Sequence, residues 1–344
     1  MRENTIFREH FLSDTFPRGG GKYSLTDTHP YRMNPDSSSA VPYHVPVLCR
    51  QATEQLVTRP EGIYIDATMG GAGHTRAILD RLSSAGHLFA FDRDADARSQ
   101  VPDDPRLTFV ASDFRFAAQW MQFYGVEQVD GILADLGVSS HHLDAGDRGF
   151  SYRYAQAVPD MRMNQRGGPS ALDILLKESE EKLAEIFYYY GELKDSRRLA
   201  SLIVAARPQG LHTVGDLLQA IEGLLPKGEA QRRGKLSRLF QALRIEVNGE
   251  MDALRQLLRH GSALLSPGGR LVFISYHSLE DRIIKDFFRT GATERNEKSS
   301  SAVPLQVITK KPLLPDAEEI ARNPRARSAK LRIAERICAP QERE

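Results

Sequence analysis

The sequence contains little cysteine and no long apolar run. Its two cysteines, Cys49 and Cys338, lie far apart and outside any partner motif, so neither a disulfide framework nor a cysteine-based zinc site is expected. No stretch approaches the roughly 18 apolar residues of a membrane span, and the N-terminus lacks the apolar core of a signal peptide. These features predict a protein of the reducing cytoplasm.

An excess of one sign of charge is also missing. The 344 residues carry a formal net charge of only +1, so a nucleic acid would have to be attracted by local basic clusters rather than by the whole surface. A composition of 41% hydrophobic and 26% charged residues is typical of a soluble globular protein. The length is enough for one large domain or two ordinary ones.

The chain is organised around residues 62–74. A short run of β-branched and aromatic residues ends in Asp66, and the small residues Gly70-Gly-Ala-Gly73 and a helix-like segment follow. A strand, a glycine-rich turn and a helix are typical of a nucleotide-binding βα unit. The glycine spacing matches neither the dinucleotide fingerprint nor a Walker A loop. A cofactor that carries an adenosine but no phosphates therefore fits better than a nucleotide polyphosphate.

Short apolar runs with helical spacers predict a parallel sheet covered on both faces. The candidate strands are residues 63–67, 87–92, 107–111, 129–135 and 270–275. The fourth and fifth are about 135 residues apart, and most of that gap has helical periodicity. We therefore expect a helical insertion between strands 4 and 5.

Two more strands are expected at 305–310 and 329–335, and the second alternates apolar and polar residues as an antiparallel edge strand does. The pattern predicts an α/β fold, the class I (Rossmann-like) methyltransferase sheet of seven strands. The expected division is a disordered extension at 1–42, a cofactor-binding domain at 43–145 and 250–338, and the helical insertion at 146–249.

Acidic residues follow three of the predicted strands. In doubly wound sheets, ligands bind outside the carboxyl ends of the strands. Asp92, about 20 residues after the glycine turn, is placed to bind ribose hydroxyls, or else it only caps the next helix. Asp66 would bind the amino group of an amino-acid tail or orient the glycine loop through backbone amides. Asp135 ends the strand at which a methyl group and its acceptor meet in this fold.

Three more residues are candidates for cofactor contacts. Phe114 follows the third strand and offers a face to an adenine, with core packing as the alternative. Asp113 beside it is placed to read the adenine amino group. His74 starts a helix at the point where a ligand carboxylate would meet helix amides, although a lone histidine is more often structural.

Tyr276 and His277 follow the fifth strand and face the same ligand-binding edge as Asp135, so all three are candidate catalytic residues. Methyl transfer needs positioning and an acceptor for the proton that an amine sheds. Ser278 is a candidate N-cap, with Asp281 completing a box-like pattern. His141 and His142 follow the fourth strand, and they lie either in a solvated turn or in a metal site. No further His, Cys or carboxylate side chains have the spacing of metal ligands, so no metal is expected.

Arginines and aromatic residues suggest an RNA partner. The stretch Asn323-Pro-Arg-Ala-Arg-Ser328 is either a solvated basic loop or a loop that contacts phosphates, through Arg325 and Arg327. The insertion adds Arg148 and Arg162 among other arginines, with tyrosines interleaved. Arginines with aromatics suit an RNA strand whose bases are splayed and stacked.

Several motifs, in this order along residues 43–337, together resemble the RsmH (MraW) family of bacterial 16S ribosomal RNA cytosine-N4 methyltransferases. They are His44-Val-Pro-Val-Leu48, Ile65-Asp-Ala-Thr-Met-Gly-Gly-Ala-Gly-His74, Phe91-Asp-Arg-Asp94, Asp135-Leu-Gly-Val-Ser-Ser140, Arg148-Gly-Phe-Ser151, Asp160-Met-Arg-Met163, Ile274-Ser-Tyr-His-Ser-Leu-Glu-Asp-Arg-Ile-Ile-Lys285 and Asn323-Pro-Arg-Ala-Arg-Ser328. The combination is specific, whereas the glycine loop alone is not.

The resemblance implies methylation of the exocyclic N4 of a cytidine in the decoding centre of 16S rRNA, within the small ribosomal subunit, with S-adenosylmethionine as donor. It implies cofactor contacts at Ala72, Gly73, His74, Asp92, Phe114, Asp135 and His142. The family usually has glycine where Ala72 stands, and the Asn/Asp-Pro-Pro-Tyr motif of many amino methyltransferases is absent, which leaves the proton acceptor open.

A base stacked in a helix cannot enter such a site, so we expect the target to be splayed or flipped out, with Tyr276 or Phe150 stacked on it. Two other functions stay open: an amino methyltransferase acting on DNA, and a non-catalytic RNA-binding or assembly factor that retains the fold. The oligomeric state also stays open between a monomer and a homodimer.

Overall fold

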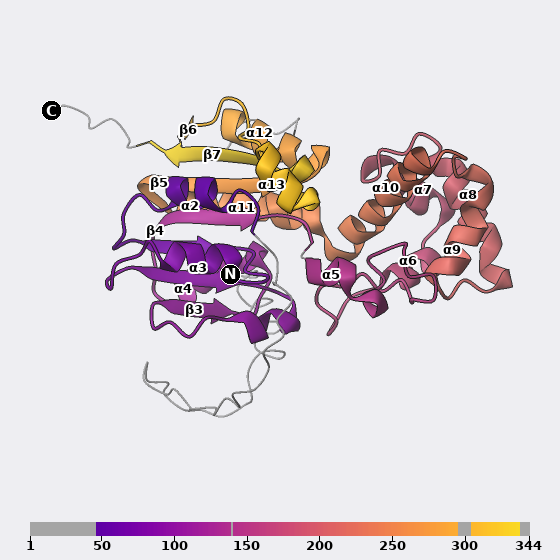
Figure 1. Ribbon diagram of the computed structural model, residues 1–344, viewed down its shortest axis with the longest axis horizontal. Coiled ribbons are helices and arrows are strands. Elements are labelled where there is room, and N and C mark those ends of the chain that lie inside the picture. Colours follow the sequence, from indigo (N-terminus) through magenta and orange to yellow (C-terminus); the bar gives the residue numbers. More distant parts are fainter. Residues whose placement is uncertain (1–45, 139, 295–303, 338–344) are drawn as a thin grey trace, which may run out of the picture. The chain divides into compact units, whose positions relative to one another are not determined.

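The computed structural model describes residues 46–138, 140–294 and 304–337, and its centre is a seven-stranded sheet of order β3-β2-β1-β4-β5-β7-β6 (Figure 1). The strands from β1 to β5 pair in parallel, and β7 is antiparallel to both of its neighbours. This confirms the predicted class I methyltransferase fold. The strands are β1 (Ile63–Asp66), β2 (His87–Phe91), β3 (Leu107–Val110), β4 (Val129–Asp135), β5 (Leu265–Ser275), β6 (Leu305–Val307) and β7 (Lys330–Arg336).

The predicted order at the antiparallel side of the sheet is wrong in one respect. β7 was expected at the edge, but it lies between β5 and β6, and the short β6 forms the edge. The alternation of apolar and polar residues misleads here because four consecutive residues of β7, Leu331 to Ala334, are buried. An internal strand buries both faces.

β5 also differs from its predicted start. It begins at Leu265 rather than at Arg270, because the Ser266-Pro-Gly-Gly269 segment before the predicted start is already part of the strand. Val129 pairs with Leu265 and Gly131 with Arg270, so the pairing with β4 shifts register across this segment. Gly268 has a φ of 78°, which a glycine adopts without a steric penalty.

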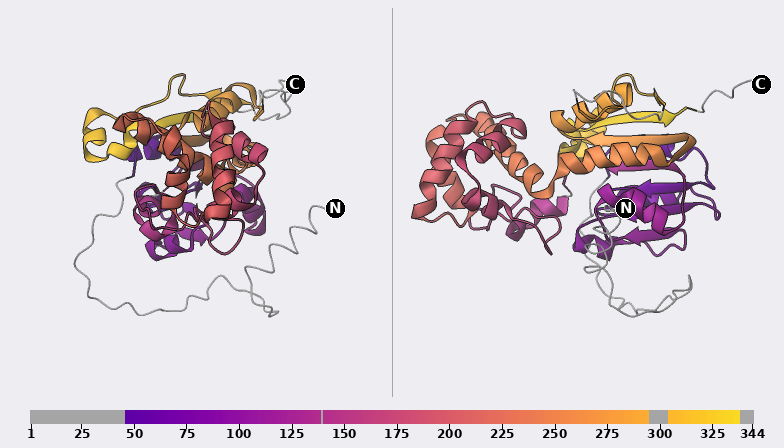
Figure 2. Two further views of the ribbon diagram at one scale, coloured as in Figure 1. Left: turned by 90° about the vertical axis from the view of Figure 1, so that its right-hand side faces the viewer. Right: turned by 180° about the vertical axis from the view of Figure 1, so that it is seen from behind.

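Helices cover both faces of the sheet, as a parallel sheet requires (Figures 1 and 2). One face carries α2 (Cys49–Leu56) and α3 (Gly73–Leu79), and the other carries α4 (Ala117–Phe123), α11 (Glu250–Leu264) and α12 (Ser278–Thr290). α11 buries an apolar stripe at the three- and four-residue spacing of a helix facing a core: Met251, Leu254, Leu257 and Leu258. A further short helix, α13 (Ala317–Arg322), precedes β7.

Between β4 and β5, the segment 146–249 (the insertion) is helical, as predicted. Its α-helices, which follow the short α5 (Ser140–Asp144), are α6 (Ala171–Lys177), α7 (Glu180–Tyr189), α8 (Ser196–Ala206), α9 (Val214–Ile221) and α10 (Glu229–Asn248). Capping boxes start α6 and α9, where Ser170 and Thr213 accept amide protons of the first turn. α10 begins at Glu229, although its first turns are polar and carry no apolar period.

The insertion has a hydrophobic core of its own, which includes Phe150, Leu183, Phe187 and Leu243. A second core joins α2 and α3 to the sheet. The described residues nevertheless fall within one compact unit, so the division of residues 43–338 into two domains stays a prediction. The predicted disordered segment 1–42 lies outside the described residues. None of the described helices is long and apolar enough to cross a membrane.

Candidate active site

The glycine-rich turn after β1 is held in place by Asp66. This side chain is fully buried, and it accepts hydrogen bonds from the Thr75 hydroxyl (2.6 Å) and the Thr68 amide (3.1 Å). Burial raises its pKa. Of the two readings for Asp66, the structure therefore supports the one in which it orients the loop.

Close packing fixes the other residues of this turn. A Cβ at Gly73 would lie 2.9 Å from Pro46 Cγ, so only glycine fits against Pro46 at this point. Ala72 has a φ of 59° and is fully buried. The left-handed conformation costs an L-residue roughly 1–2 kcal/mol. The glycine that the family usually has at this position would not carry that strain.

Asp92 at the end of β2 fits a cofactor that carries a ribose. Its Oδ2 accepts the Gly70 amide and its Oδ1 accepts the Asp94 amide, both at 2.8 Å. A carboxylate has about four acceptor sites, so two amide bonds leave room for two hydroxyl donors. Burial raises the pKa of Asp92, and the two amides and His142 counter that effect. The chemistry of this side chain therefore suits the predicted ribose contact.

The residues after β3 fit their predicted roles less well. Phe114 is half-buried at the start of a short 3₁₀ helix, so its ring is not wholly core. Asp113 caps that helix, and its Oδ2 pairs with Arg93 (2.9 Å) and Arg115 (3.2 Å). Two guanidinium groups thus occupy the carboxylate that was expected to read an adenine amino group.

A buried charge cluster lies next to Asp92 in sequence. Asp94 Oδ2 is 2.6 Å from His142 Nε2 and 3.2 Å from the Arg148 guanidinium, which also bonds the Arg162 and Met163 carbonyls. Burial alone would raise the pKa of Asp94, but His142, the Asp96 amide and Arg148 lower it to about 2. His142, predicted to touch the cofactor, is directed at Asp94 instead.

Two residues predicted to bind RNA are buried in this region. The side chain of Arg148 is only 5% exposed and is engaged by Asp94 and Asp96. Phe150 is also 5% exposed, and its ring lies 4.9 Å from that of His142. The structure corrects both assignments, because a buried guanidinium and a core ring are not presented to an RNA strand. Their motif joins the insertion to the sheet.

At the end of β4, Asp135 meets Tyr276, which follows β5. The Tyr276 hydroxyl donates to Asp135 Oδ1 at 2.8 Å. Burial raises the pKa of Asp135 to about 7, Tyr276 counters the rise and Glu280 adds to it. The Asp135 side chain is still 16% exposed. The structure therefore brings two of the three predicted catalytic residues together, and one of them is a carboxylate that can exchange a proton near neutral pH.

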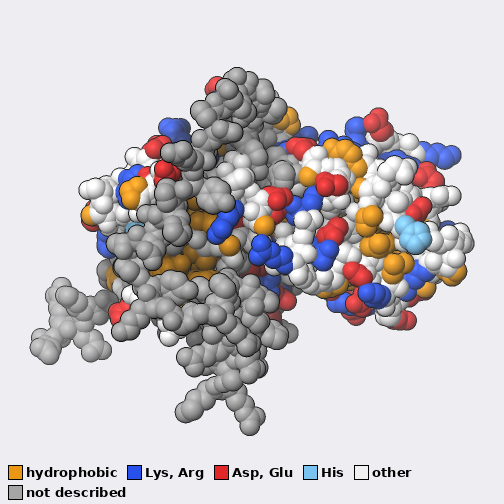
Figure 3. Space-filling model, turned by 90° about the horizontal axis from the view of Figure 1, so that it is seen from below, with side chains coloured by type: hydrophobic (Ala, Val, Ile, Leu, Met, Phe, Trp, Pro, Cys, Tyr) orange, Lys and Arg blue, Asp and Glu red, His pale blue; other side chains and the backbone are white. Residues whose placement is uncertain are grey.

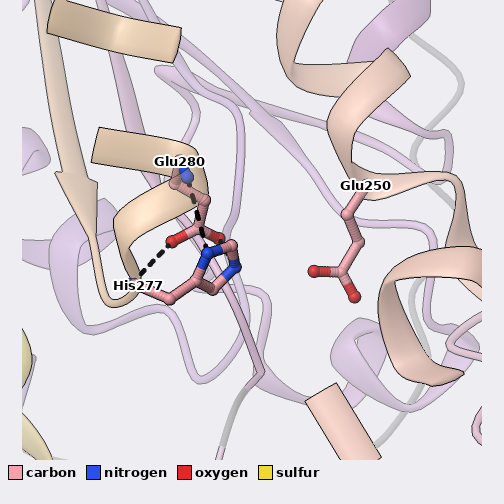
Figure 4. Close-up of side chains that lie close together, drawn as sticks. All are labelled: Glu250, His277 and Glu280. Carbon is pink, nitrogen blue, oxygen red and sulfur yellow. Dashed lines mark hydrogen bonds and ion pairs between the residues drawn. The ribbon is translucent and has the colours of Figure 1, made fainter. Parts of the chain in front are cut away.

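The third predicted catalytic residue, His277, lies in a different cluster. His277 rather than Ser278 is the N-cap of α12, and it forms a capping box with Glu280. Its Nε2 is 3.1 Å from Glu280 Oε1, and Glu250 faces this pair from the start of α11 (Figure 4). The spacing of these three side chains could suit a metal ion, but Arg244 already pairs with both oxygens of Glu250 at 2.8 and 2.9 Å.

His74 is buried, and its ring faces the protein interior rather than open solvent. Nε2 lies 3.0 Å from the Val47 carbonyl oxygen, and Nδ1 lies 3.6 Å from Asp135 Oδ2. Burial lowers the pKa of His74, although the charge of Asp66 opposes this. A cofactor contact through the His74 ring is therefore not evident, and its closest charged partner is Asp135.

The remaining predicted RNA contacts lie on the surface. Arg162 pairs with Asp160 at 2.7 Å, and Arg325 pairs with Asp144 at 2.8 Å, beside Arg153. Arg327 is exposed. Asp144 thus joins the basic loop near the chain end to the start of the insertion. Over the insertion, Figure 3 shows Lys and Arg side chains interspersed with Asp and Glu rather than gathered in one basic field.

A model of the MraW methylase family matches residues 42–337. The chain belongs to that family. It is 52% identical over 301 residues to the ribosomal RNA small subunit methyltransferase H of Parabacteroides distasonis, which covers 86% of this chain and 98% of that protein. It is 50% identical over 312 residues to the protein of that name from Porphyromonas gingivalis, covering 88% of this chain and 99% of that protein.

Membership of the MraW family confirms the resemblance read from the motifs. It makes the protein a methyltransferase with S-adenosylmethionine as methyl donor. The Asp135–Tyr276 pair and the Asp92-bound loop lie at the carboxyl edge of the sheet, where ligands bind in doubly wound folds.

The sequence predictions missed three features of the site. Asp94 was not singled out, because its partners His142 and Arg148 lie about 50 residues away along the chain. The Arg244–Glu250 pair was missed although its residues are six positions apart, because the turn at Gly249 between α10 and α11 brings the two side chains together. Glu280 did have a local signal, since it stands three residues after His277, the spacing of a capping box.

Proposed function

We propose that the protein methylates the exocyclic N4 of a cytidine in the decoding centre of 16S rRNA, in the small ribosomal subunit. The observation that carries the proposal is the Asp135–Tyr276 pair, a buried carboxylate of raised pKa at the end of the central strand β4. An amine that accepts a methyl group must lose a proton, and such a carboxylate is suited to take it. The names of the family relatives support ribosomal RNA as the substrate class.

Bound S-adenosylmethionine supplies a methyl group on a positively charged sulfonium. We propose that Asp92 accepts hydrogen bonds from the ribose hydroxyls, and that the backbone of Ala72 and Gly73 and the half-buried ring of Phe114 also contact the cofactor. Asp135 accepts a hydrogen bond from the cytosine amine and holds it in line, and the Tyr276 hydroxyl fixes the carboxylate through Oδ1.

The weak nucleophilicity of the acceptor limits how it can bind. The N4 lone pair is delocalised into the cytosine ring, so the amine must be placed close to the methyl group. A stacked base cannot reach the end of β4, and we therefore propose a splayed or flipped-out cytidine. With Phe150 buried in the insertion, the half-buried ring of Tyr276 is the stacking partner of this proposal.

For the RNA strand itself, we propose contacts at Arg325, Arg327 and Arg162. The Arg325–Asp144 and Arg162–Asp160 pairs are both partly exposed at the surface, and exposed ion pairs are worth little, so phosphates can compete with the carboxylates. The reaction requires access to ribosomal RNA, and we propose that it takes place in the cytoplasm.

The test is to incubate the full-length protein with labelled S-adenosylmethionine and, in parallel, unmodified small subunits, naked 16S rRNA and DNA. We expect label in N4-methylcytidine of the small-subunit RNA, identified by nucleoside analysis. Label only in DNA would support an amino methyltransferase acting on DNA. Label in no substrate would contradict the proposal and favour a non-catalytic RNA-binding factor.

A further inference from the structure

His74 links the segment before α2 to the catalytic carboxylate. Its ring is held between the Val47 carbonyl oxygen, 3.0 Å from Nε2, and Asp135 Oδ2, 3.6 Å from Nδ1. The side chain of His74 is 5% exposed. Asp66 acts on His74 through its charge, and it accepts a hydrogen bond from Thr75, which follows His74 in the same helix. The ring therefore has a fixed position next to Oδ2 of Asp135.

The contact with Val47 decides which nitrogen carries the proton. A carbonyl oxygen has no proton to give, so Nε2 must be the donor. Burial lowers the pKa of His74, so the ring is neutral and Nδ1 has a lone pair. That lone pair faces Asp135 Oδ2. An ionised carboxylate and an unprotonated Nδ1 are both acceptors, so they form no hydrogen bond. A protonated Oδ2, in contrast, can donate a hydrogen bond to Nδ1.

The two oxygens of Asp135 thus have different partners. Oδ1 accepts from the Tyr276 hydroxyl at 2.8 Å, which stabilises the ionised carboxylate. Oδ2 faces an acceptor, which stabilises the protonated carboxyl. At 3.6 Å this contact is too long for a formed hydrogen bond. Catalytic hydrogen bonds are often long without substrate and shorten in the complex.

Among the described residues, no Lys or Arg is found to act on His74, Asp135 or Tyr276. The titratable groups that act on Asp135, His74 or Tyr276 from the packed elements are Asp66 at the end of β1, Cys49 of α2, Glu280 of α12 and Glu319 of α13. Three of the four are acids. An acidic environment favours uptake of a proton by Asp135 and opposes its release.

We propose that His74 is a positioning residue for methyl transfer, whose Nδ1 accepts a hydrogen bond from the proton that Asp135 takes from the cytosine amine. The inference rests on the proposed function. In the step, the sulfur–methyl bond breaks and the nitrogen–methyl bond forms. One N4–H bond breaks, and its proton forms an O–H bond on Asp135. The positive sulfonium becomes a neutral thioether and the negative carboxylate becomes neutral, so the charges balance.

Two substitutions at His74 separate its two hydrogen bonds. In His74→Gln, the amide N–H can take the place of Nε2 and keep the Val47 contact, but no acceptor stands at the Nδ1 position. In His74→Asn, an amide oxygen can take the place of Nδ1, and the Val47 contact is lost. Single-turnover methylation of unmodified small subunits at saturating S-adenosylmethionine is measured from about pH 5 to about pH 9.

The inference predicts that His74→Gln is the more damaging substitution. Its plateau rate falls about tenfold, because Asp135 is a weaker base without the acceptor. Its acid limb moves to lower pH, because the protonated carboxyl has lost its stabilising partner. His74→Asn stays within about threefold of the wild type. A purely structural role for the Val47 contact predicts the reverse order and an unmoved acid limb, and either result would overturn the inference.

His87→Gln is the matched control. His87 begins β2, at the opposite end of the strands from Asp135, and bonds the Thr108 hydroxyl at 2.9 Å. The pH profile of this variant should equal that of the wild type. Absence of methylated RNA with the wild type would overturn the proposed function. A wild type that methylates, with the two His74 variants in the wrong order, would overturn only the role of His74.

A measurement on the wild type removes any dependence on how the variants fold. Nitrogen-15 NMR of labelled histidines distinguishes a protonated from an unprotonated ring nitrogen, and His74→Gln identifies the His74 signals. We expect a protonated Nε2 and an unprotonated Nδ1 at neutral pH. A proton on Nδ1 would contradict the inference, since that nitrogen could not then accept from Asp135.

Discussion

Two carboxylates at the same edge of the sheet, Asp94 and Asp135, are both largely buried and have opposite properties. Asp94 faces Arg148 and His142, and its pKa is lowered to about 2. Asp135 faces a hydroxyl and a neutral imidazole, and its pKa is raised to about 7. A fixed guanidinium makes the first a structural anchor. Its absence leaves the second able to accept a proton.

The largest effect is expected when the guanidinium that faces Asp94 is removed. Arg148→Ala leaves a buried carboxylate without its guanidinium, and we expect a loss of about 3–5 kcal/mol in the free energy of unfolding. Urea unfolding measures it. Arg327→Ala, at an exposed arginine, is the control and should change stability by less than about 0.5 kcal/mol. Equal effects of the two substitutions would show that the Asp94 cluster does not anchor the insertion.

The charge on Asp94 itself has a smaller expected effect. A pKa of about 2, against the ordinary 3.8, corresponds to about 2 kcal/mol of stability. Because the folded pKa is depressed, this contribution is present above about pH 4 and is lost as the pH falls towards about 2. Asp94→Asn should therefore lower the unfolding free energy at pH 7 and flatten its pH dependence in that window. If the unfolding free energy of Asp94→Asn fell with pH as steeply as that of the wild type, the lowered pKa of Asp94 would be contradicted.

Tyr276→Phe tests the raised pKa of Asp135, the second carboxylate of the comparison. It keeps the ring but removes the hydroxyl that stabilises ionised Asp135 through Oδ1. The pKa of Asp135 should rise, and the single-turnover rate at pH 7 should fall about tenfold, since less of the carboxylate is ionised. The loss should shrink as the pH rises. Tyr276→Ala removes the ring as well, and an equal rate for the two variants would argue against stacking on the base.

The smallest effect is expected in the glycine turn. Ala72 holds a left-handed conformation with a φ of 59°, and Ala72→Gly should raise stability by about 1 kcal/mol. Thermal unfolding measures the gain. S-adenosylmethionine affinity should stay within about threefold, because the backbone path of the turn does not change. A loss of stability would mean that the buried methyl group contributes more than the strain costs.

Much of the fold was predictable because its signals are local. The strands from β1 to β4 are short apolar runs that end in acidic or small residues, and their predicted bounds agree with the structure to within one residue. The order of β6 and β7 was not predictable, because it depends on which of the two strands pairs with β5 and not on the residue pattern within either strand.

The candidate site was predictable only in part. Its residues at strand ends, Asp92 and Asp135, follow from the rule that ligands bind there. Burial of Arg148 and Phe150 could not be read from the sequence, because an arginine beside an aromatic looks the same on a surface as in a salt-bridged core. The partners of His74, Val47 and Asp135, lie 27 and 61 residues away in opposite directions along the chain, and only folding joins them.

The central claim is that Asp135 accepts a proton near neutral pH while Asp94 stays ionised. Carbon-13 NMR of protein labelled at the aspartate carboxyl groups measures both directly, with Asp135→Asn and Asp94→Asn to assign the signals. We predict that the signal lost in Asp135→Asn titrates near pH 7, and that the signal lost in Asp94→Asn is still ionised at pH 4. An Asp135 carboxyl that titrates near the ordinary 3.8 would contradict the account.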